Sequence, residues 1–187
     1  MILANYLAGS LPFGLMIAKV FRGIDPREKG SGNIGATNVL RVAGKKAAVA
    51  TLIFDLIKGL PFIFAARLAG FENRIVLLVG LAAILGHIFS VFLRFKGGKG
   101  VATSFGVILV LTPQVAIAGL LFWGGGVFFG KYSSVGALTA FGILPLLTFF
   151  FNLGADFVIF SIIVTLLVYF RHWENIRRLL QGREGTV

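Results

Sequence analysis

Long uninterrupted apolar runs are the feature that most limits what this chain can fold into. Six runs approach the length of about 20 residues that a helix needs to cross the hydrocarbon core of a bilayer. They are Ile2–Phe21, Ala47–Ala66, Arg74–Phe92, Gln114–Gly130, Val135–Phe151 and Ala155–Phe170. None alternates in strands of about ten residues, the pattern of a β-barrel. The sequence therefore predicts an all-α integral membrane protein with one transmembrane domain over residues 1–187.

The charge of the chain fits a membrane protein better than a nucleic-acid-binding one. Only 13% of the residues are charged, about half the usual share, yet the net charge is +11. The basic residues lie between the apolar runs, where Lys and Arg hold loops on the cytoplasmic side. We therefore expect membrane lipid, and no nucleic acid, as a partner. The chain has no cysteine, which excludes disulfides and thiol chemistry.

A seventh apolar segment, Val101–Leu111, is only about half as long as the hydrocarbon core is thick. It is either a short helix of its own or the first half of a helix kinked at the following proline. Seven helices with the N-terminus outside place nearly all Lys and Arg residues in cytoplasmic loops. Six helices would put Lys131 and the C-terminal arginines outside. The sequence favours seven transmembrane helices with the N-terminus outside and the C-terminus cytoplasmic.

The first polar loop reads "GSGNIGATNVLR" from Gly30 to Arg41. Its glycines allow successive backbone N–H groups to turn inward and form an anion-binding nest. Ser31, Thr37 and Asn38 add neutral hydrogen-bonding groups, and Arg41 adds a charged guanidinium four residues after Thr37. A flexible loop that ends in a helix N-cap is the alternative interpretation.

The second loop, "FKGGKGVAT" from Phe95 to Thr103, resembles a phosphate loop without being a Walker A motif. Its glycines are Gly97, Gly98 and Gly100, and Lys99 stands between two of them. A helix that begins near Val101 would direct its N-terminal dipole at an anion. A cluster of lysines that only sets the topology is the alternative, and Lys96 fits it better than Lys99.

A third polar stretch, "RHWENIRRLLQGRE", runs from Arg171 to Glu184. Helical spacing places His172, Asn175 and Arg178 on one face, with Glu174 able to pair with the arginines. A solvated, salt-bridged helix end is the expectation for Arg177, Arg183 and Glu184. For His172 and Asn175, function and solvation are equally supported. The predicted topology places all three polar stretches at the cytoplasmic face.

Two further features lie within the apolar runs. Asp55 and Lys58 would each cost about 2.5–3.5 kcal/mol to insert alone, and at this spacing they can neutralise one another. Helix packing and catalysis both remain open for this pair. We expect His87 to be a hydrogen-bonded packing histidine. The His, Asp and Glu spacing predicts no metal site, and no G-x-S-x-G elbow occurs.

Two glycine-rich cationic loops at one membrane face favour a site for phosphate-bearing molecules. Lipid synthesis fits, because one substrate can come from the cytosol while the product enters the bilayer. No nucleophile–base triad is evident. An acyl donor would therefore need to be activated already, leaving the protein to position and neutralise two anions.

At these residues the chain resembles the bacterial acyl-phosphate:glycerol-3-phosphate acyltransferases of the PlsY type. The similarity covers "YLAGSLPFG", "GSGNIGATNVLR", "DLIKG", "GHIFSVFLRFKGGKGVAT", "YSSVG" and "HWENIRRLLQGRE". Ser90, Trp173 and Lys131 depart from the usual pattern of that family. The resemblance implies a seven-helix protein of the bacterial cytoplasmic membrane with its active site facing the cytoplasm.

The activity that the resemblance implies is transfer of a fatty acyl group from acyl phosphate to the 1-hydroxyl of glycerol 3-phosphate. The products are lysophosphatidic acid, an intermediate of phospholipid biosynthesis, and phosphate. No cofactor, metal or obligatory protein partner is implied. A transporter of organophosphate anions is the alternative function, since glycine-interrupted helices and basic residues suit it too. Against it, no inverted repeat is visible and the polar motifs avoid the midplane.

The motifs give a set of expected site residues. The expected ligands of glycerol 3-phosphate are Ser31, Arg41, Lys99, His172 and Asn175. The expected ligands of acyl phosphate are Thr37, Asn38, Gly97, Gly98, Lys99, Gly100 and Ser134. The expected catalytic residues are Ser31, Lys99, His172 and Asn175. Either His172 or an oxygen of the acyl phosphate removes the hydroxyl proton, and the resemblance favours the oxygen. A covalent role for Ser31 is less favoured, because no base adjoins it in the sequence.

Overall fold

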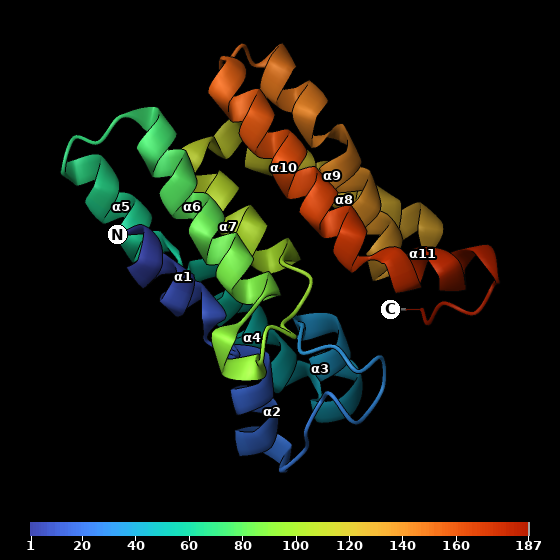
Figure 1. Ribbon diagram of the computed structural model, residues 1–187. Coiled ribbons are helices and arrows are strands. Elements are labelled where there is room, and N and C mark those ends of the chain that lie inside the picture. Colours follow the sequence, from blue (N-terminus) through green and yellow to red (C-terminus); the bar gives the residue numbers. More distant parts are fainter. Residues whose placement is uncertain (187) are drawn as a thin grey trace. The chain divides into compact units, whose positions relative to one another are not determined.

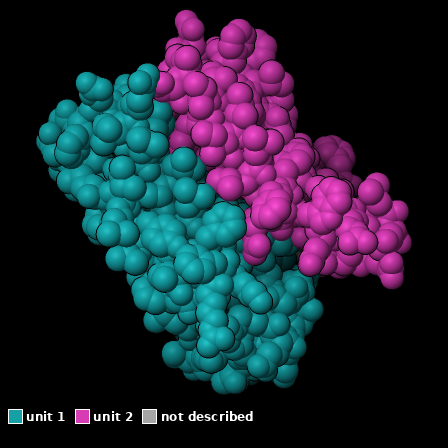
Figure 2. Space-filling view, viewed as in Figure 1, with its two compact units in different colours: residues 1–110 teal, residues 111–187 magenta. Residues whose placement is uncertain are grey.

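The computed structural model describes residues 1–186, and these are helical with no β-strand among them. They form two compact units, an N-terminal unit of residues 1–110 and a C-terminal unit from Leu111 onward (Figure 2). The N-terminal unit holds α1 (Ile2–Ser10), α2 (Phe13–Arg22), α3 (Ala36–Ala43), α4 (Lys45–Ile57), α5 (Leu60–Leu68), α6 (Asn73–Ile88), the 3-10 turn η1 (Val91–Leu93) and most of α7 (Val101–Leu111). The C-terminal unit holds α8 (Pro113–Gly130), α9 (Ser133–Phe150), α10 (Ala155–Arg171) and α11 (Trp173–Leu180).

Five helical stretches of the described residues are long and apolar enough to cross a membrane. They are Ile2–Arg22, Lys45–Leu68, Asn73–Leu93, Pro113–Gly130 and Ser133–Phe150. A sixth is α10 with α11, which are bent by 58° relative to one another. Large apolar side chains such as Val20, Leu68 and Leu121 are exposed on these helices, as expected where lipid is the solvent. The prediction of an all-α membrane protein is confirmed, whereas seven spans, their orientation and a single domain stay predictions.

The short segment forms a helix of its own, α7, at the expected bounds Val101–Leu111. Thr112 separates it from α8, which begins at Pro113. Proline suits this first helical position, because the N–H that it lacks would have no partner inside the helix. Of the two sequence interpretations, the structure therefore shows a separate short helix.

Close backbone contact holds α1 against α6, which run alongside one another in the N-terminal unit (Figure 1). A Cβ atom on Gly9 would lie 2.2 Å from the carbonyl oxygen of Ala83, and one on Gly86 would lie 2.1 Å from that of Tyr6. Asn5 Nδ2 also donates to the Val79 carbonyl at 2.8 Å. Small residues and interhelical hydrogen bonds are how helices pack in lipid, where no hydrophobic force draws them together.

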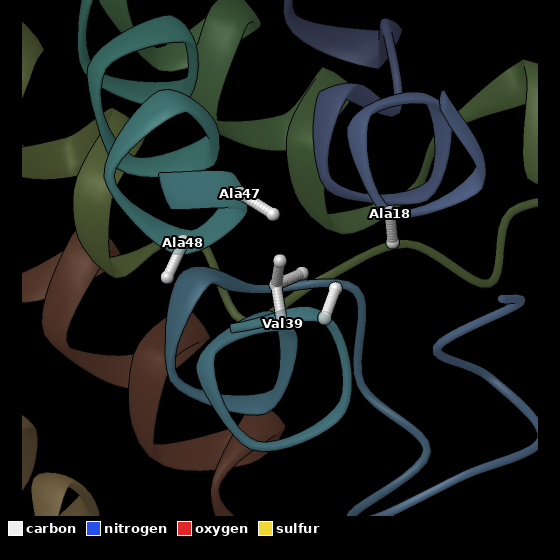
Figure 3. Packing of buried hydrophobic residues seen from close by; sticks show 5 residues of the cluster. Ala18, Val39, Ala47 and Ala48 are labelled. Atoms are coloured by element: carbon white, nitrogen blue, oxygen red, sulfur yellow. The ribbon is translucent and has the colours of Figure 1, made fainter. Parts of the chain in front are cut away.

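A small apolar cluster fixes the short helix α3 beside the membrane helices. It consists of Ala18, Val39, Ala43, Ala47 and Ala48. Val39 on α3 points toward Ala47 on α4, with Ala18 on α2 nearby (Figure 3). Because four of the five side chains are alanine, the three helices approach closely. The packing holds in place the helix that carries Thr37 and Arg41.

In the C-terminal unit, α9 packs against both α8 and α10 and contains a proline in its second half, Pro145. Proline has no N–H, so the carbonyl of Phe141, four residues earlier, loses its usual helical donor. Thr165 on α10 replaces that donor, because its hydroxyl donates to the Phe141 carbonyl at 2.7 Å. A neighbouring helix thus satisfies the backbone group that the proline frees.

Replacing Thr165 with valine is expected to destabilise the protein by about 1–2 kcal/mol, because the Phe141 carbonyl loses the Thr165 hydroxyl as a donor in a partly buried place. The measurement is the thermal midpoint of the purified protein in detergent, on which the valine variant should unfold several degrees below wild type. Thr165→Ser keeps the hydroxyl and is the matched control. Equal midpoints for the valine and serine variants would show that the hydrogen bond contributes nothing.

Candidate active site

The first glycine-rich loop is organised around the amide of Asn38, which is only 2% exposed. Its Nδ2 lies 2.8 Å from the Pro26 carbonyl, 3.1 Å from that of Lys29 and 2.8 Å from that of Asn33. Its Oδ1 accepts the N–H of Ser31 at 2.8 Å. A side chain so engaged inside the loop favours an organising role for Asn38 over the predicted contact with a headgroup.

The other predicted site residues of this loop are Ser31, Thr37 and Arg41, and the hydrogen bonds of Asn38 hold the backbone around them. Thr37 and Arg41 both lie on α3, four residues apart, as the spacing predicts. Arg41 and Ser31 are exposed, and Thr37 is half-buried. The structure thus offers a hydroxyl and a guanidinium from one helix, together with Ser31 at the loop where the chain enters it.

The turn before this loop is fixed by Asp25. Its carboxylate accepts two side-chain hydrogen bonds from Arg27, at 2.9 and 2.6 Å, and lies 3.7 Å from Lys19 Nζ. The hydrogen bonds from Arg27 lower the pKa of Asp25 to about 2, despite the opposing effect of burial. The ion pair therefore persists at any pH at which the protein would work.

The second glycine-rich loop lies against the end of α6. The N–H of Gly97 donates to the Ile88 carbonyl at 3.1 Å, and that of Gly98 to the His87 carbonyl at 3.0 Å. A Cβ atom on Gly97 would lie 2.1 Å from the His87 carbonyl oxygen, and one on Gly98 would lie 2.2 Å from His87 Nε2. No side chain fits at either position, which is why the motif needs glycine there.

These contacts reduce the number of backbone N–H groups in the second loop that can bind a phosphate. Because the N–H groups of Gly97 and Gly98 already donate to α6 carbonyls, they are not oriented as donors to a phosphate. Gly100 has a φ of +84°, a left-handed conformation that glycine adopts without strain, and α7 begins at the next residue. The N-terminal turn of α7, with half-buried Lys99 beside it, is thus the part of this loop that suits an anion.

The structure brings the two loops to the same part of the N-terminal unit. Ile34 of the first loop packs with Leu93, which ends η1 just before the second, and with Leu15 of α2. A Cβ atom on Gly14 would lie 1.8 Å from the Ile34 carbonyl oxygen, so the first loop also rests closely on α2. Both loops therefore share one support, as the prediction of a common face requires.

In the C-terminal unit, three side chains converge on the carboxylate of Glu184. Its Oε1 accepts the Ser134 hydroxyl at 2.9 Å and Asn175 Nδ2 at 2.5 Å, and its Oε2 accepts Arg178 Nε at 2.7 Å. The Glu184 side chain is only 7% exposed. The salt bridge expected for Glu184 is confirmed in its pair with Arg178, but the expected solvation is wrong, since the carboxylate is enclosed by a polar cluster.

The electrostatics of Glu184 follow from these contacts. Burial alone would raise the pKa of its carboxyl, but the hydrogen bonds from its three partners together lower it from the ordinary value. The group therefore stays a carboxylate at neutral pH. It joins two predicted site residues, Ser134 and Asn175, which are 41 positions apart in the chain. Sequence spacing could not reveal this, because Glu184 follows the end of α11 and helical periodicity stops there.

His172 stands at the bend between α10 and α11 and is buried. Its Nδ1 lies 2.8 Å from the Val168 carbonyl, which can only accept, so Nδ1 carries a proton and donates. Nε2 is thus the ring atom that can take up a further proton or, once protonated, donate it. A backbone carbonyl therefore orients the Nδ1 edge of this ring.

Asp55, Lys58 and His87 form one buried cluster in the N-terminal unit. Lys58 Nζ lies 2.9 Å from Asp55 Oδ1 and 2.8 Å from His87 Nδ1. The expected pairing of Asp55 with Lys58 is confirmed. His87 is hydrogen-bonded, as expected, but its membership of this cluster was not predicted, because it lies on another helix and sequence spacing gives no sign of the contact.

Comparison with known proteins decides the family. The profile of the family described as glycerol-3-phosphate acyltransferase matches residues 1–182, nearly the whole chain. The chain belongs to the glycerol-3-phosphate acyltransferase family. This confirms the resemblance inferred from the glycine-rich motifs.

Curated relatives in this acyltransferase family match along their full length. The chain is 41% identical over 186 residues to the glycerol-3-phosphate acyltransferase of Dechloromonas aromatica, covering 100% of this chain and 94% of the relative. It is 47% identical over 188 residues to that of Desulfotalea psychrophila, covering 98% of this chain and 95% of the relative. The level of identity places the chain well inside the family.

Two crystal structures of PlsY, described as an integral membrane glycerol 3-phosphate acyltransferase, have the same fold. The glycerol 3-phosphate form has a TM-score of 0.93 at 41% identity and covers 100% of this chain and 93% of PlsY. The lysophosphatidic acid form has a TM-score of 0.90 at 40% identity, covering 99% and 92%. The chain is therefore a multi-pass membrane protein of the acyltransferase family.

Proposed function

We propose that this protein transfers a fatty acyl group from acyl phosphate to the 1-hydroxyl of glycerol 3-phosphate, giving lysophosphatidic acid and phosphate. One observation carries the acyl transfer: the chain matches PlsY along its length, and PlsY structures exist in a glycerol 3-phosphate form and a lysophosphatidic acid form. These two molecules are the acceptor and the product of a single acylation. The reaction would supply a precursor for phospholipid biosynthesis.

The choice of acyl phosphate as donor rests on the site's chemistry. His172 Nδ1 donates to a backbone carbonyl, at the ring atom that a carboxylate orients in a nucleophile–base triad. An enzyme without an activated nucleophile needs a donor whose leaving group departs readily. Phosphate is such a group, and the glycine-rich loop with Lys99 at the start of α7 has the donors to hold it.

We assign the substrate contacts by the donor chemistry of each motif. Ser31, Arg41 and Lys99 would bind the phosphate of glycerol 3-phosphate, and the sequence assigns His172 and Asn175 to the same substrate. Acyl phosphate would be bound by the donors near Lys99 and Gly100, by Thr37 and by Ser134. Asn38, Gly97 and Gly98 would serve as supports that position those donors, in keeping with the hydrogen bonds they make inside the fold.

The reaction step balances without a cofactor or metal. The oxygen of the glycerol 1-hydroxyl forms a bond to the acyl carbon, and the bond from that carbon to the phosphate oxygen breaks. The hydroxyl proton passes to an oxygen of the departing phosphate, which leaves as inorganic phosphate. The role of the protein is to bring two anions together and to stabilise the charge on the leaving group, for which Lys99 is suited.

The proposal includes a location. Seven transmembrane helices, with α7 as the short one, would place the N-terminus outside and the C-terminus in the cytoplasm. Nearly all Lys and Arg residues would then lie on the cytoplasmic side of a bacterial inner membrane. The glycine-rich loops would face the cytosol, from which glycerol 3-phosphate arrives.

The experiment that tests the function mixes purified protein in detergent with acyl phosphate and glycerol 3-phosphate and follows phosphate release. Release that requires both substrates, together with lysophosphatidic acid as product, supports the enzyme. An absence of release, combined with uptake of glycerol 3-phosphate into liposomes that contain the protein, would show the alternative, a transporter of organophosphate anions. Lys99→Met protein serves as the control for a contaminating phosphatase.

A His172→Ala variant is expected to keep kcat within about tenfold of wild type, because the departing phosphate takes the proton. The KM for glycerol 3-phosphate is expected to rise, since the ring is one of its proposed ligands. Steady-state kinetics with both substrates varied provide the measurement. A fall in kcat of three orders of magnitude or more at unchanged KM would instead make His172 the base.

A further inference from the structure

The buried cluster around Lys58 is closed in its hydrogen bonding. The Lys58 ammonium has three protons and three acceptors within reach. These are Asp55 Oδ1 at 2.9 Å, the Leu11 carbonyl at 3.2 Å and His87 Nδ1 at 2.8 Å. The side chains of Asp55, Lys58 and His87 are all buried. Each removal would leave a buried group without its partner, so the cluster acts as a unit.

This arrangement fixes the protonation of His87. Lys58 Nζ also donates to Asp55 Oδ1 and to the Leu11 carbonyl, two groups that only accept, so its third proton is directed at His87 Nδ1, 2.8 Å away. The proton therefore belongs to Lys58, and His87 Nδ1 accepts from it. The ring is neutral and carries its own proton on Nε2.

The opposite edge of the same ring lies on the glycine-rich loop. His87 Nε2 is so close to Gly98 that a Cβ atom there would be 2.2 Å away. The carbonyl of His87 also accepts the Gly98 N–H at 3.0 Å. His87 thus contacts Gly98 through both its backbone and its side chain, immediately before Lys99.

A second contact joins the cluster to the helix that follows the loop. Thr103, in the first turn of α7, donates its hydroxyl to the backbone carbonyl of Asp55 at 2.9 Å and lies 3.2 Å from His87 Nδ1. The cluster therefore supports both sides of Lys99: Gly98 before it and the first turn of α7 after it. Burying charged groups is unfavourable, and a role in setting this geometry explains why the chain keeps them here.

We propose that His87, held neutral and oriented by Lys58 and Asp55, is a positioning residue that fixes the glycine-rich loop so that Lys99 meets the phosphate of the substrate. The inference rests on the proposed function for the identity of that substrate. It gives the intramembrane ion pair a role in substrate binding through the loop and not through contact with the substrate.

The decisive variant is His87→Asn. The Oδ1 of asparagine takes the place of Nδ1 as acceptor for Lys58, while the ring edge that rests on Gly98 is removed. We expect this variant to fold, with a thermal midpoint near that of wild type, and to show a KM for glycerol 3-phosphate raised at least about tenfold. We expect kcat to fall by less than that factor.

The control is Asn5→Ala, which removes another buried polar contact of the N-terminal unit, the bond to the Val79 carbonyl. It should lower the thermal midpoint and leave KM unchanged. A second variant, Asp55→Asn with Lys58→Met, removes both charges together and avoids leaving one buried alone. It should raise KM as His87→Asn does, because the ring loses its orientation.

A binding readout that needs no turnover separates this inference from the proposed function. We expect inorganic phosphate and glycerol 3-phosphate each to raise the thermal midpoint of wild type. The ligand concentration needed for the same rise should be at least tenfold higher for His87→Asn. A folded His87→Asn protein with KM and phosphate binding within twofold of wild type would overturn the positioning role. So would a loss confined to kcat. A wild-type protein that binds phosphate but acylates nothing would refute the proposed function alone.

Discussion

A Lys99→Met enzyme is expected to lose at least two to three orders of magnitude in kcat/KM, by order-of-magnitude reasoning from charge-assisted contacts to phosphate. Lys99 stands between two buried glycines, Gly98 and Gly100, and Gly100 has a φ of +84°. The backbone conformation on both sides of Lys99 is therefore constrained. Methionine keeps the length of the side chain and its apolar stem but removes the charge. The loss should therefore report the phosphate contact and not the packing of the loop.

The matched control for this prediction is Lys96→Met, in the same loop. Lys96 is exposed and precedes the two buried glycines, so its charge lies outside the part of the loop that α6 holds. We expect its kcat/KM to stay within about threefold of wild type. Steady-state rates of phosphate release for both variants decide the matter. A Lys99→Met enzyme with near-normal turnover, or equal losses in both variants, would place the phosphate elsewhere.

The sequence predicts the class of this fold well, because hydropathy alone determines which segments lipid can surround. Val101–Leu111 is a helix at its expected bounds, and the other apolar runs are helical. The run Ile2–Phe21, however, divides into α1 and α2, and α4 ends just before Lys58. A hydropathy profile cannot show these breaks, because both sides of each are equally apolar.

One of these breaks is tied to the buried cluster, which explains it physically. The Leu11 carbonyl lies just past the end of α1, where it accepts the N–H of Phe13 at 3.0 Å and, as a second donor, Lys58 Nζ at 3.2 Å. From the sequence alone, a lysine in a membrane segment is expected to make insertion less favourable. In the structure it donates a second hydrogen bond to the backbone carbonyl at the point where the helix is interrupted. Such a partnership spans 47 positions and depends on the tertiary fold.

The sequence predicted the parts of the candidate site whose donors are close together in the chain. It did not predict contacts between residues that are far apart in the chain. The spacing of Thr37 and Arg41 places them together on α3 without any further information. Asn38 has the same polar character in the sequence, yet burial turns it toward Pro26 and Asn33, and composition cannot tell an organising amide from a binding one. Polar loop residues that bind substrate can thus be told apart from those that organise the loop only by their contacts in the folded structure.

Replacing Glu184 with glutamine is expected to lower activity strongly, because two predicted site residues donate to its carboxylate. Replacing it with glutamine leaves one oxygen where the carboxylate has two, so an N–H must face either Asn175 Nδ2 or Arg178 Nε, both of which are donors. An unmatched buried donor costs about 1–3 kcal/mol, and the Asn175 amide loses the acceptor that orients it. We expect kcat/KM to fall by about ten- to a hundredfold, through a higher KM for glycerol 3-phosphate.

Glu174→Gln is the matched control, since Glu174 lies on α11 with its side chain 85% exposed and its ion pair with Arg178 is loose, at 3.9 Å. An exposed pair of this kind is worth little, so its kinetics should equal those of wild type. The comparison also decides what the Glu184 carboxylate does. If it positions Asn175, as we expect, its loss raises KM. If instead it competes with a phosphate for Asn175 and Ser134, its loss lowers KM, and the sign of the change separates the two.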